Sequence, residues 1–151
     1  MRIGIVGSEA SKFTPETEIL ARHAILSRIR KDGGDVIISG ECHLGGVDIY
    51  AKEIAQHWGL GYIGYPPKHH SWTYGYRPRN VKIAKESDKV VCITIKDYPA
   101  TYDGMKFIRL IDGKETPYCY HCDSYSHVKS GGCWTMHYAH KLGKNIELII
   151  I

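Results

Sequence analysis

Apolar residues occur along this chain in short runs that are bounded by glycine, serine or charged residues. The runs are four to seven residues long and rich in isoleucine, valine and tyrosine, which is shorter than most helices. Apolar runs of this kind are typical of strands in a parallel sheet that is covered on both faces. They predict five strands, at residues 2–6, 35–38, 62–65, 89–95 and 145–151.

Between these runs, apolar positions recur at the spacing of an amphipathic helix. The first helix is predicted to begin at Pro15 with Thr14 as its cap, and to end before Gly33. In the second helix, the apolar residues from Val47 to Trp58 share one face. The remaining predictions are helices at residues 80–86 and 134–142, a loop at residues 68–79, and an irregular segment at residues 97–130.

This alternation of strands and helices predicts an α/β fold. The expected architecture is a Rossmann-like three-layer sandwich, in which helices cover both faces of a mainly parallel five-stranded sheet. We expect one domain over residues 1–151, interrupted by a Cys/His-containing insertion at residues 97–133. The length of 151 residues suits a single core.

The charge of the chain suits an anionic ligand. A formal net charge of +4 is mildly basic, and the lysines and arginines are spread along the sequence rather than gathered in a stripe. Nucleic-acid binding is therefore not the favoured function. The first residues do not resemble a signal peptide, and no apolar run approaches the ~20 residues of a membrane span. We expect a cytoplasmic protein that is not membrane-bound and has reduced cysteines.

Glycine and hydroxyl residues follow several of the predicted strands. Ligands of open parallel sheets bind beyond the carboxyl ends of the strands, and glycine lets the backbone approach them closely. A phosphate can also accept hydrogen bonds from the free N–H groups of a helix N-terminus. The alternative is that these glycines only form turns, and the usual G-x-G-x-x-G fingerprint is absent. The positions concerned are Gly7-Ser8, Ser39-Gly40, Gly45-Gly46 and Ser130-Gly131-Gly132.

Five stretches of the sequence, in order, carry a resemblance to a known group. They are IGIVGSEASKFT, ISGECHLGGVDIYAKEIA, YPP, RPRN and SGGCWTMHYAHKLGK. Together they resemble the SLOG superfamily, which includes the LONELY GUY phosphoribohydrolases and the DNA-processing protein A family, and within it the small branch related to YspA and YpsA. The resemblance implies a Rossmann-like fold, a nucleotide-derived ligand and a homodimer. The ligand residues that it implies are Gly7, Ser8, Ser39, Gly40, Gly46, Asp48, Arg79, Asn80, Gly131, Gly132 and Thr135.

The sequence departs from the LONELY GUY pattern at one position that matters for catalysis. The glutamate of PGGxGTxxE is replaced by Tyr138, so phosphoribohydrolase activity is not carried over. Glu41 is a weak candidate for a substitute acid or base, and an exposed loop carboxylate is the simpler interpretation. Three functions stay open: a nucleotide sensor or binding module, which we favour narrowly, an enzyme that hydrolyses an N-glycosidic or phosphate bond, and a nucleic-acid-binding protein.

The insertion contains a cluster of metal-ligand residues. Cys119 and Cys122 form a CxxC pair, followed by His127 and Cys133, which is close to the spacing of a zinc knuckle. We predict structural Zn²⁺ at these four residues; the alternative is that the cysteines are free thiols in a reducing cell. His121 is a rival ligand that should point outward from the turn. Cys42 and Cys92 are expected to be unrelated to the metal, with Cys92 in the core.

The segment between the third strand and its helix forms a basic and aromatic rim. Aromatic rings can stack on a base and arginine can contact phosphate. The same residue types are also common in surface or dimer interfaces, and the two interpretations stay equal. The rim residues are Lys68, His69, His70, Trp72, Tyr74, Tyr76, Arg77 and Arg79.

Overall fold

The computed structural model describes residues 1–151, and its centre is a five-stranded sheet in the order β3-β2-β1-β4-β7. All four strand pairings are parallel, which confirms the predicted fold class. The strands are β1 (Arg2–Gly7), β2 (Val36–Ser39), β3 (Gly61–Gly64), β4 (Lys89–Thr94) and β7 (Asn145–Ile150). The chain leaves β1 toward β2 and β3 and then returns to the other side of β1 as β4. The strand order therefore reverses between β1 and β4, where open α/β sheets bind ligands.

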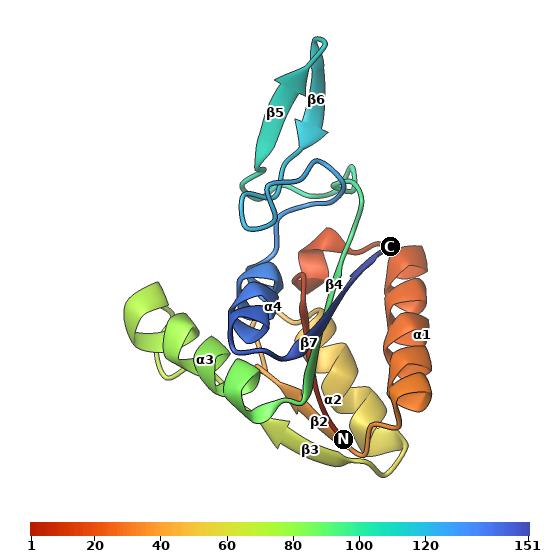
Figure 1. Ribbon diagram of the computed structural model, residues 1–151. Helices are drawn as coiled ribbons and strands as arrows, with labels where there is room; N and C mark the ends of the chain where they lie inside the picture. Colours follow the sequence, from red (N-terminus) through yellow and green to blue (C-terminus); the bar gives the residue numbers. More distant parts are fainter.

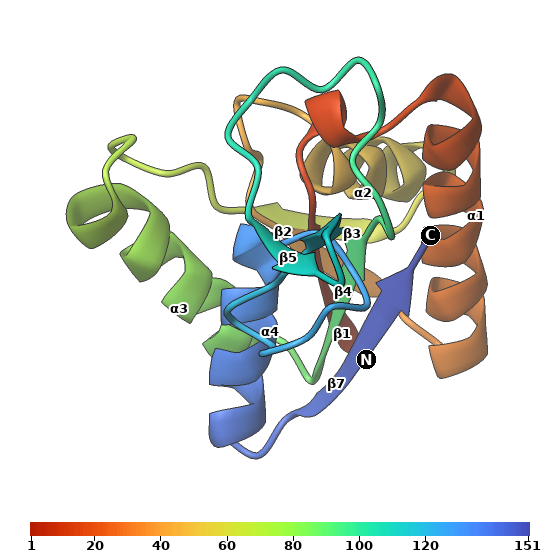
Figure 2. The ribbon, with the colours of Figure 1, turned by 90° about the horizontal axis from the view of Figure 1, so that it is seen from above.

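Helices cover both faces of the sheet, as Figure 2 shows from above. One core contains the buried faces of α1 (Pro15–Asp32) and α2 (Val47–His57) together with Ile3, Ile5 and Ile93. The other core contains α3 (Arg77–Glu86) and α4 (Gly131–Lys141) with Ile38 and Val90. The central strands β1, β2 and β4 are buried on both faces, which explains why their apolar runs are continuous rather than alternating, whereas the edge strands β3 and β7 are only half-buried.

The start and end of α1 follow the signals in the sequence. The Thr14 side chain accepts a hydrogen bond from the Thr17 amide at 3.1 Å, while the Thr17 hydroxyl oxygen accepts one from the Thr14 amide at 2.8 Å. Pro15 occupies the first turn, where its missing N–H costs nothing. Gly33 ends the helix in the left-handed conformation with φ of 69°.

Two predicted boundaries near the carboxyl ends of the strands are wrong. The segment predicted as a loop up to residue 79 contains a π-helical turn, η2 (Trp72–Tyr76), that runs directly into α3 at Arg77. Only Gly75 is buried in η2, so the turn leaves no apolar periodicity in the sequence. Helix α4 begins at Gly131, earlier than the predicted residue 134, because the Ser130 side chain caps two glycines of low helix propensity.

The insertion is not irregular throughout, as the sequence had suggested. It contains an antiparallel hairpin, β5 (Ile108–Ile111) and β6 (Lys114–Pro117), which projects beyond the carboxyl ends of the sheet (Figure 1). Asp112 and Gly113 form its turn, both with positive φ, of 51° and 76°. Asp-Gly is the residue pair that this kind of two-residue turn prefers, so the signal was present in the sequence.

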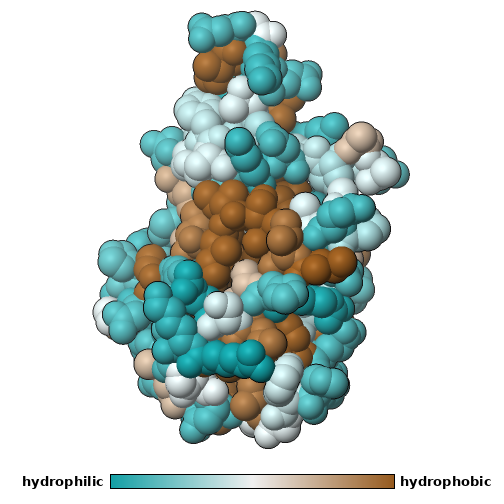
Figure 3. Space-filling view, turned by 90° about the vertical axis from the view of Figure 1, so that its right-hand side faces the viewer, coloured by the Kyte–Doolittle hydropathy of each residue, from teal (hydrophilic) through white to brown (hydrophobic).

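One face of the molecule gathers apolar side chains around the C-terminus and the first turns of α1 (Figure 3). Ile19 and Leu20 of α1 and Ile150 of the edge strand β7 are exposed there. None of the helices has the combination of length and apolar character that crossing a bilayer requires. The homodimer implied by the resemblance stays a prediction.

A glycine before α2 gives a test of this packing. Gly46 has φ of 86°, and a Cβ at this position would lie 2.3 Å from the Ser8 carbonyl oxygen. We expect Gly46→Ala to lower the free energy of unfolding in urea by more than about 3 kcal/mol, because backbone strain and a backbone clash add. Gly33→Ala is the matched control: its φ is also positive but the space around it is open. It should cost about 1 kcal/mol. Equal losses for the two variants would contradict the close packing at Gly46.

Candidate functional site

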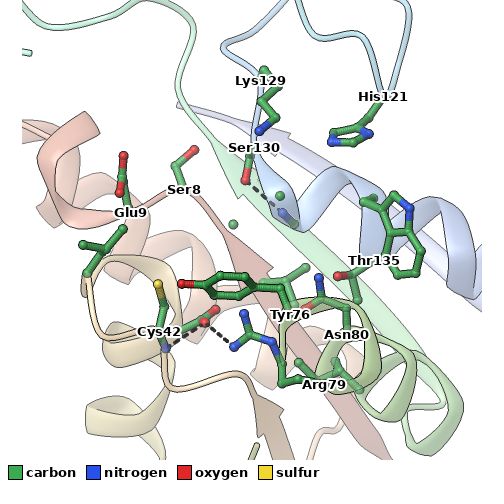
Figure 4. Close-up of a pocket in the computed structure, with 18 of the residues that line it drawn as sticks. Ser8, Glu9, Cys42, Tyr76, Arg79, Asn80, His121, Lys129, Ser130 and Thr135 are labelled. Atoms are coloured by element: carbon green, nitrogen blue, oxygen red, sulfur yellow. Dashed lines mark hydrogen bonds and ion pairs between the residues drawn. The ribbon is translucent and has the colours of Figure 1, made fainter. Parts of the chain in front are cut away.

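A cleft of about 680 Å³ lies beyond the carboxyl ends of β1 and β4 (Figure 4). Its walls come from the turn after β1, the loop before α2, the start of α3, the insertion and the start of α4. Nine of the twelve predicted ligand positions line it. They are Gly7, Ser8, Asp48, Arg79, Asn80, Ser130, Gly131, Gly132 and Thr135.

The turns at residues 7 and 130–132 meet at the floor of the cleft. A Cβ on Gly132 would lie 2.6 Å from the Gly7 backbone nitrogen, and a Cβ on Gly7 would lie 2.0 Å from the Ile93 carbonyl oxygen. The first turn of α4 therefore rests on the end of β1, and β1 on β4. This contact brings the N-terminus of α4 to the point where the strand order reverses.

The other three predicted residues lie behind the cleft and support it. The Ser39 hydroxyl, which is fully buried, donates a hydrogen bond to the Asp48 carbonyl at 3.1 Å. The Gly40 carbonyl accepts a hydrogen bond from the Arg79 guanidinium. Gly46 packs against the backbone of Ser8 and Glu9. These three residues position neighbours that line the cleft.

The weak catalytic candidate Glu41 is engaged elsewhere. Its carboxylate forms an ion pair with Lys52 at 2.6 Å and accepts a hydrogen bond from the Tyr62 hydroxyl at 3.4 Å. Glu41 is not among the residues that line the cleft. The simpler interpretation, an exposed loop carboxylate, is correct about the loop and wrong about the exposure, since the side chain is 22% exposed and is held by these two partners.

Asp48 and Arg79 form a buried pair in the wall of the cleft. Their side chains are 10% and 9% exposed, and the guanidinium lies 3.6 Å from the carboxylate. The Asp48 carboxylate also accepts a hydrogen bond from the Cys42 amide at 3.1 Å. Burial raises the pKa of Asp48, and the positive charge of Arg79 opposes this effect only in part.

Two lysines give one end of the cleft a positive charge. Lys12, in the short helix η1 (Ala10–Lys12), donates a hydrogen bond to the Lys129 carbonyl at 3.1 Å. Burial lowers the pKa of Lys12. Lys129 comes from the insertion, and both side chains line the cleft beside Ser130, the cap of α4. Lys12 was not predicted from the sequence, because it is far from α4 along the chain. Only the turn after β1 brings it to Lys129, 117 residues later, next to the start of that helix.

The cleft also has polar groups without partners. The Thr135 side chain is 1% exposed, and its hydroxyl has no hydrogen-bond partner. Figure 4 shows this hydroxyl on the side of α4 that faces the cleft. The Arg79 Nε is likewise buried without a partner. A buried polar group without a partner is costly, so two of them in one cleft indicate a site that is completed by a ligand.

Aromatic side chains line the cleft beside the charged ones: the Lys129 ammonium lies 5.4 Å from the centre of the Tyr120 ring, and the Arg79 guanidinium lies 5.5 Å from the centre of the Tyr76 ring. The rings of Trp72 and Trp134 meet edge to face with centroids 4.9 Å apart. Tyr76 and Tyr120 also line the cleft. Only part of the rim predicted at residues 68–79 lines the cleft. Trp72, Tyr76 and Arg79 line the cleft, whereas the other rim residues do not; these are Lys68, His69, His70, Tyr74 and Arg77.

The four predicted metal ligands come together beside the cleft. One ligand atom from each of Cys119, Cys122, His127 and Cys133 lies within 4.8 Å of all the others. Cys119, His127 and Cys133 are fully buried. Ser126 Oγ lies 2.8 Å from Nδ1 of His127, which leaves Nε2 facing the cysteines. The cluster is therefore consistent with a metal site.

The protonation of the three cysteines is divided, because their mutual hydrogen bonds lower the pKa of Cys119 and Cys122 and raise the pKa of Cys133. The pKa of Cys119 is lowered to about 3, first by its hydrogen bond with Cys133 and then by His127. The pKa of Cys122 is lowered to about 6, first by the same Cys133 and also by His137. Thiolates, which are the metal-binding form of cysteine, are favoured at both positions.

The sequence predicted the surroundings of His121 and Cys92 only in part and gave no indication of His137. His121 lies outside the metal cluster, as expected, but its ring lines the cleft rather than facing away from the protein. Cys92 is in the core, and its sulfur lies 3.8 Å from that of Cys133, so it is not remote from the cluster. His137 of α4 was missed; its Nε2 lies 3.2 Å from the Cys122 sulfur.

The pKa of Asp48 gives a test of the buried pair. Because the folded state raises this pKa above the ordinary value of 3.8, the folded protein holds the Asp48 proton more tightly than the unfolded chain does. The contribution of Asp48 to stability is therefore present at low pH and is lost as the pH rises from 3.8 through the folded pKa.

We expect Asp48→Asn to gain stability relative to the wild type as the pH increases from about 4 to about 7, measured by urea unfolding. Asp112→Asn, in the exposed hairpin turn, is the control and should not change relative to the wild type over this range. A wild-type stability that increases with pH relative to Asp48→Asn would contradict the raised pKa.

Comparisons with protein-family models, with curated proteins and with solved structures each found no match to this chain. The resemblance to the SLOG superfamily therefore stays a prediction from the sequence.

Proposed function

We propose that the chain binds a nucleotide, or a nucleotide-derived ligand that carries a phosphate group, in the cleft at the carboxyl ends of β1 and β4. The observation that carries the proposal is the buried Thr135 hydroxyl without a partner, in the first turns of α4. A phosphate oxygen at this position would accept a hydrogen bond from the Thr135 hydroxyl. The N-terminus of α4 supplies further donors and the positive end of a helix dipole.

The charges in the cleft support an anion rather than a neutral ligand. Lys12 and Lys129 line the same cleft as Thr135, and the Ser130 cap accepts a hydrogen bond from the Gly132 N–H. A Cβ at Gly131 would meet no atom within 4 Å, so the backbone there is open to a ligand. Backbone donors and two ammonium groups in one cleft suit a phosphate monoester.

The presence of aromatic side chains beside basic ones in the cleft supports a nucleotide rather than free phosphate. Trp72, Trp134 and Tyr120 lie along the same cleft as the lysines, and Trp72 is 44% exposed. An exposed indole face is a good surface on which to stack a base. A volume of about 680 Å³ is within the range of small-molecule sites.

Binding, rather than catalysis, is the function that the geometry favours. The carboxylate of Asp48 is paired with Arg79, and burial raises the pKa of the Cys42 thiol that also lines the cleft, which makes it a poor nucleophile. Glu9 is the remaining carboxylate in the cleft. A hydrolase would need Glu9 as its acid or base, which is the second candidate function and a more demanding one.

We also propose that the Cys/His cluster binds Zn²⁺ as a structural ion. Three sulfur atoms and one imidazole nitrogen within 4.8 Å of one another are a ligand set that tetrahedral zinc prefers. A fourth protein ligand leaves no open position for catalysis. The zinc would hold the insertion against the start of α4, since Cys133 belongs to that helix.

A panel of phosphate compounds tests the binding function. We expect nucleoside monophosphates to raise the melting temperature, ribose 5-phosphate to raise it less, and short oligonucleotides to have no effect. Stabilisation by oligonucleotides alone, lost at high salt, would overturn the proposal in favour of nucleic-acid binding. Chromatography of the nucleotides after incubation would reveal hydrolysis, and Glu9→Gln should abolish it if Glu9 is the catalytic group.

Thr135→Val tests the residue that carries the proposal. Valine has the shape of threonine without the buried hydroxyl, so the ligand-free variant should be about 1 kcal/mol more stable than the wild type. The same change should weaken nucleotide binding about tenfold, because the donor to the phosphate is lost. Thr101→Val, at an exposed position, is the matched control and should change neither quantity. A Thr135→Val variant with unchanged affinity would exclude the placement of the phosphate.

Metal analysis tests the zinc site. Protein purified without a metal-affinity tag should contain about one equivalent of zinc per chain, and removing the zinc should lower the melting temperature. Cys119→Ala should lose the metal, whereas Cys42→Ala, which lies outside the cluster, should keep it. A zinc content that is the same in the two variants would rule out this ligand set.

A further inference from the structure

The insertion contributes to the cleft only through residues that lie between metal-ligand candidates. Tyr120 and His121 line the cleft and lie between Cys119 and Cys122 in the sequence. The four residues at 129–132 also line it, and they lie between His127 and Cys133. Both segments are thus held at each end by a residue of the metal cluster.

The second of these segments contains most of the anion-binding groups proposed above. It provides the Lys129 ammonium, the Ser130 cap and the backbone of Gly131 and Gly132. Its carbonyl oxygen at Lys129 accepts the hydrogen bond from Lys12, which links it to the turn after β1. A displacement of this segment would therefore move both lysines and the first turn of α4.

The core of the insertion is too small to fix these segments without metal. From residue 103 to residue 126, Cys119 is the only buried residue, and it belongs to the cluster. The hairpin β5–β6 is exposed along most of its length. Aromatic contacts such as Phe107 with Tyr120 and Tyr118 with Tyr125 are half-exposed, so few buried apolar contacts offset the conformational entropy of ordering about thirty residues, and metal coordination would add to them.

Hydrogen bonds connect the ordered segment to the sheet on its other side. The Thr94 hydroxyl at the end of β4 donates to the Val128 carbonyl at 2.9 Å and lies 2.9 Å from the Ser8 hydroxyl. The Val128 amide donates to the Ile95 carbonyl at 2.9 Å. A change in the position of His127 is thus transmitted to Ser8, which lines the cleft.

From this placement we infer that metal binding and ligand binding are energetically coupled. Metal in the Cys/His cluster holds the two bracketed segments in the geometry that binds a phosphate ester, so metal raises the affinity for the ligand. By thermodynamic linkage, the ligand raises the affinity for the metal by the same factor. This inference rests on the proposed function, and it makes the metal a determinant of binding rather than only of stability.

Titration of the zinc-loaded and zinc-free protein with adenosine 5′-monophosphate and inorganic phosphate tests the coupling. We expect both probes to bind the zinc-free protein about tenfold more weakly or worse, with far-UV circular dichroism showing that the sheet is still folded. Equal affinity of the folded zinc-free and zinc-loaded forms would overturn the inference while leaving the proposed function intact. Failure of both probes to bind the zinc-loaded protein would instead overturn the proposed function and, with it, the coupling.

Cobalt substitution provides a test that does not require a folded metal-free protein. Co²⁺ in a thiolate site has visible absorption bands that report its geometry. Titration with adenosine 5′-monophosphate should shift these bands in the wild type, and the same shift should need about tenfold more nucleotide in Thr135→Val, which keeps all four ligand candidates. If the zinc-free protein is unfolded, an unchanged cobalt spectrum of the ligand-saturated wild type overturns the coupling.

Discussion

The close approach of two backbone segments, at Gly7 and Gly132, determines where every other part of the cleft can lie. Any side chain on Gly132 would come within 2.6 Å of the Gly7 nitrogen, so the first turn of α4 reaches the end of β1 only because both positions lack one. The contact aims the positive end of α4 at the place where the strand order reverses. Polar groups from the insertion, the turn after β1 and the start of α3 then surround one volume. Parallel sheets in general bind ligands at the carboxyl ends of their strands, and in this chain the contact between Gly7 and Gly132 determines where at that edge the cleft forms.

The sheet was predictable because its signals are local. Each central strand is an unbroken apolar run that ends at a glycine, serine or charged residue, and Thr14, Pro15 and Gly33 mark the ends of α1 by well-understood capping chemistry. The π-helical turn at Trp72–Tyr76 was not predictable, because its packing depends on the contact of Gly75 with the backbone of His69 rather than on a periodic face. The hairpin was missed for a different reason: Asp112-Gly113 is a strong turn signal, but both flanking strands are exposed and show no apolar alternation.

The candidate site was predictable to the extent that it depends on backbone geometry. Glycines and hydroxyls at strand ends located six of the positions that line the cleft, and the resemblance to the SLOG superfamily added four more, whereas the charged residue Lys12 was found in neither way. Its role depends on a hydrogen bond to Lys129, across most of the chain length. The metal cluster was predictable because its spacing is local, and Cys133, which follows Gly132 directly, already indicated that the metal would tie the insertion to the turn at residues 130–132. Only the fold shows that Tyr120, His121 and residues 129–132 face the ligand volume from between the metal ligands.

The cleft departs from the rest of the core in ways that reduce stability. A hydroxyl at Thr135 and the Nε of Arg79 are buried without partners, and burial lowers the pKa of Lys12 and raises that of Asp48. Groups of this kind are tolerated in proteins mainly where a ligand completes them, since each would otherwise favour replacement by an apolar residue. Outside the cleft, the Nε of Arg28 is also buried without a hydrogen-bond partner, and Glu41 has a positive φ of 48°. Two of the three buried side-chain atoms without a partner nevertheless lie in this one cleft, which supports the proposal that a ligand binds there.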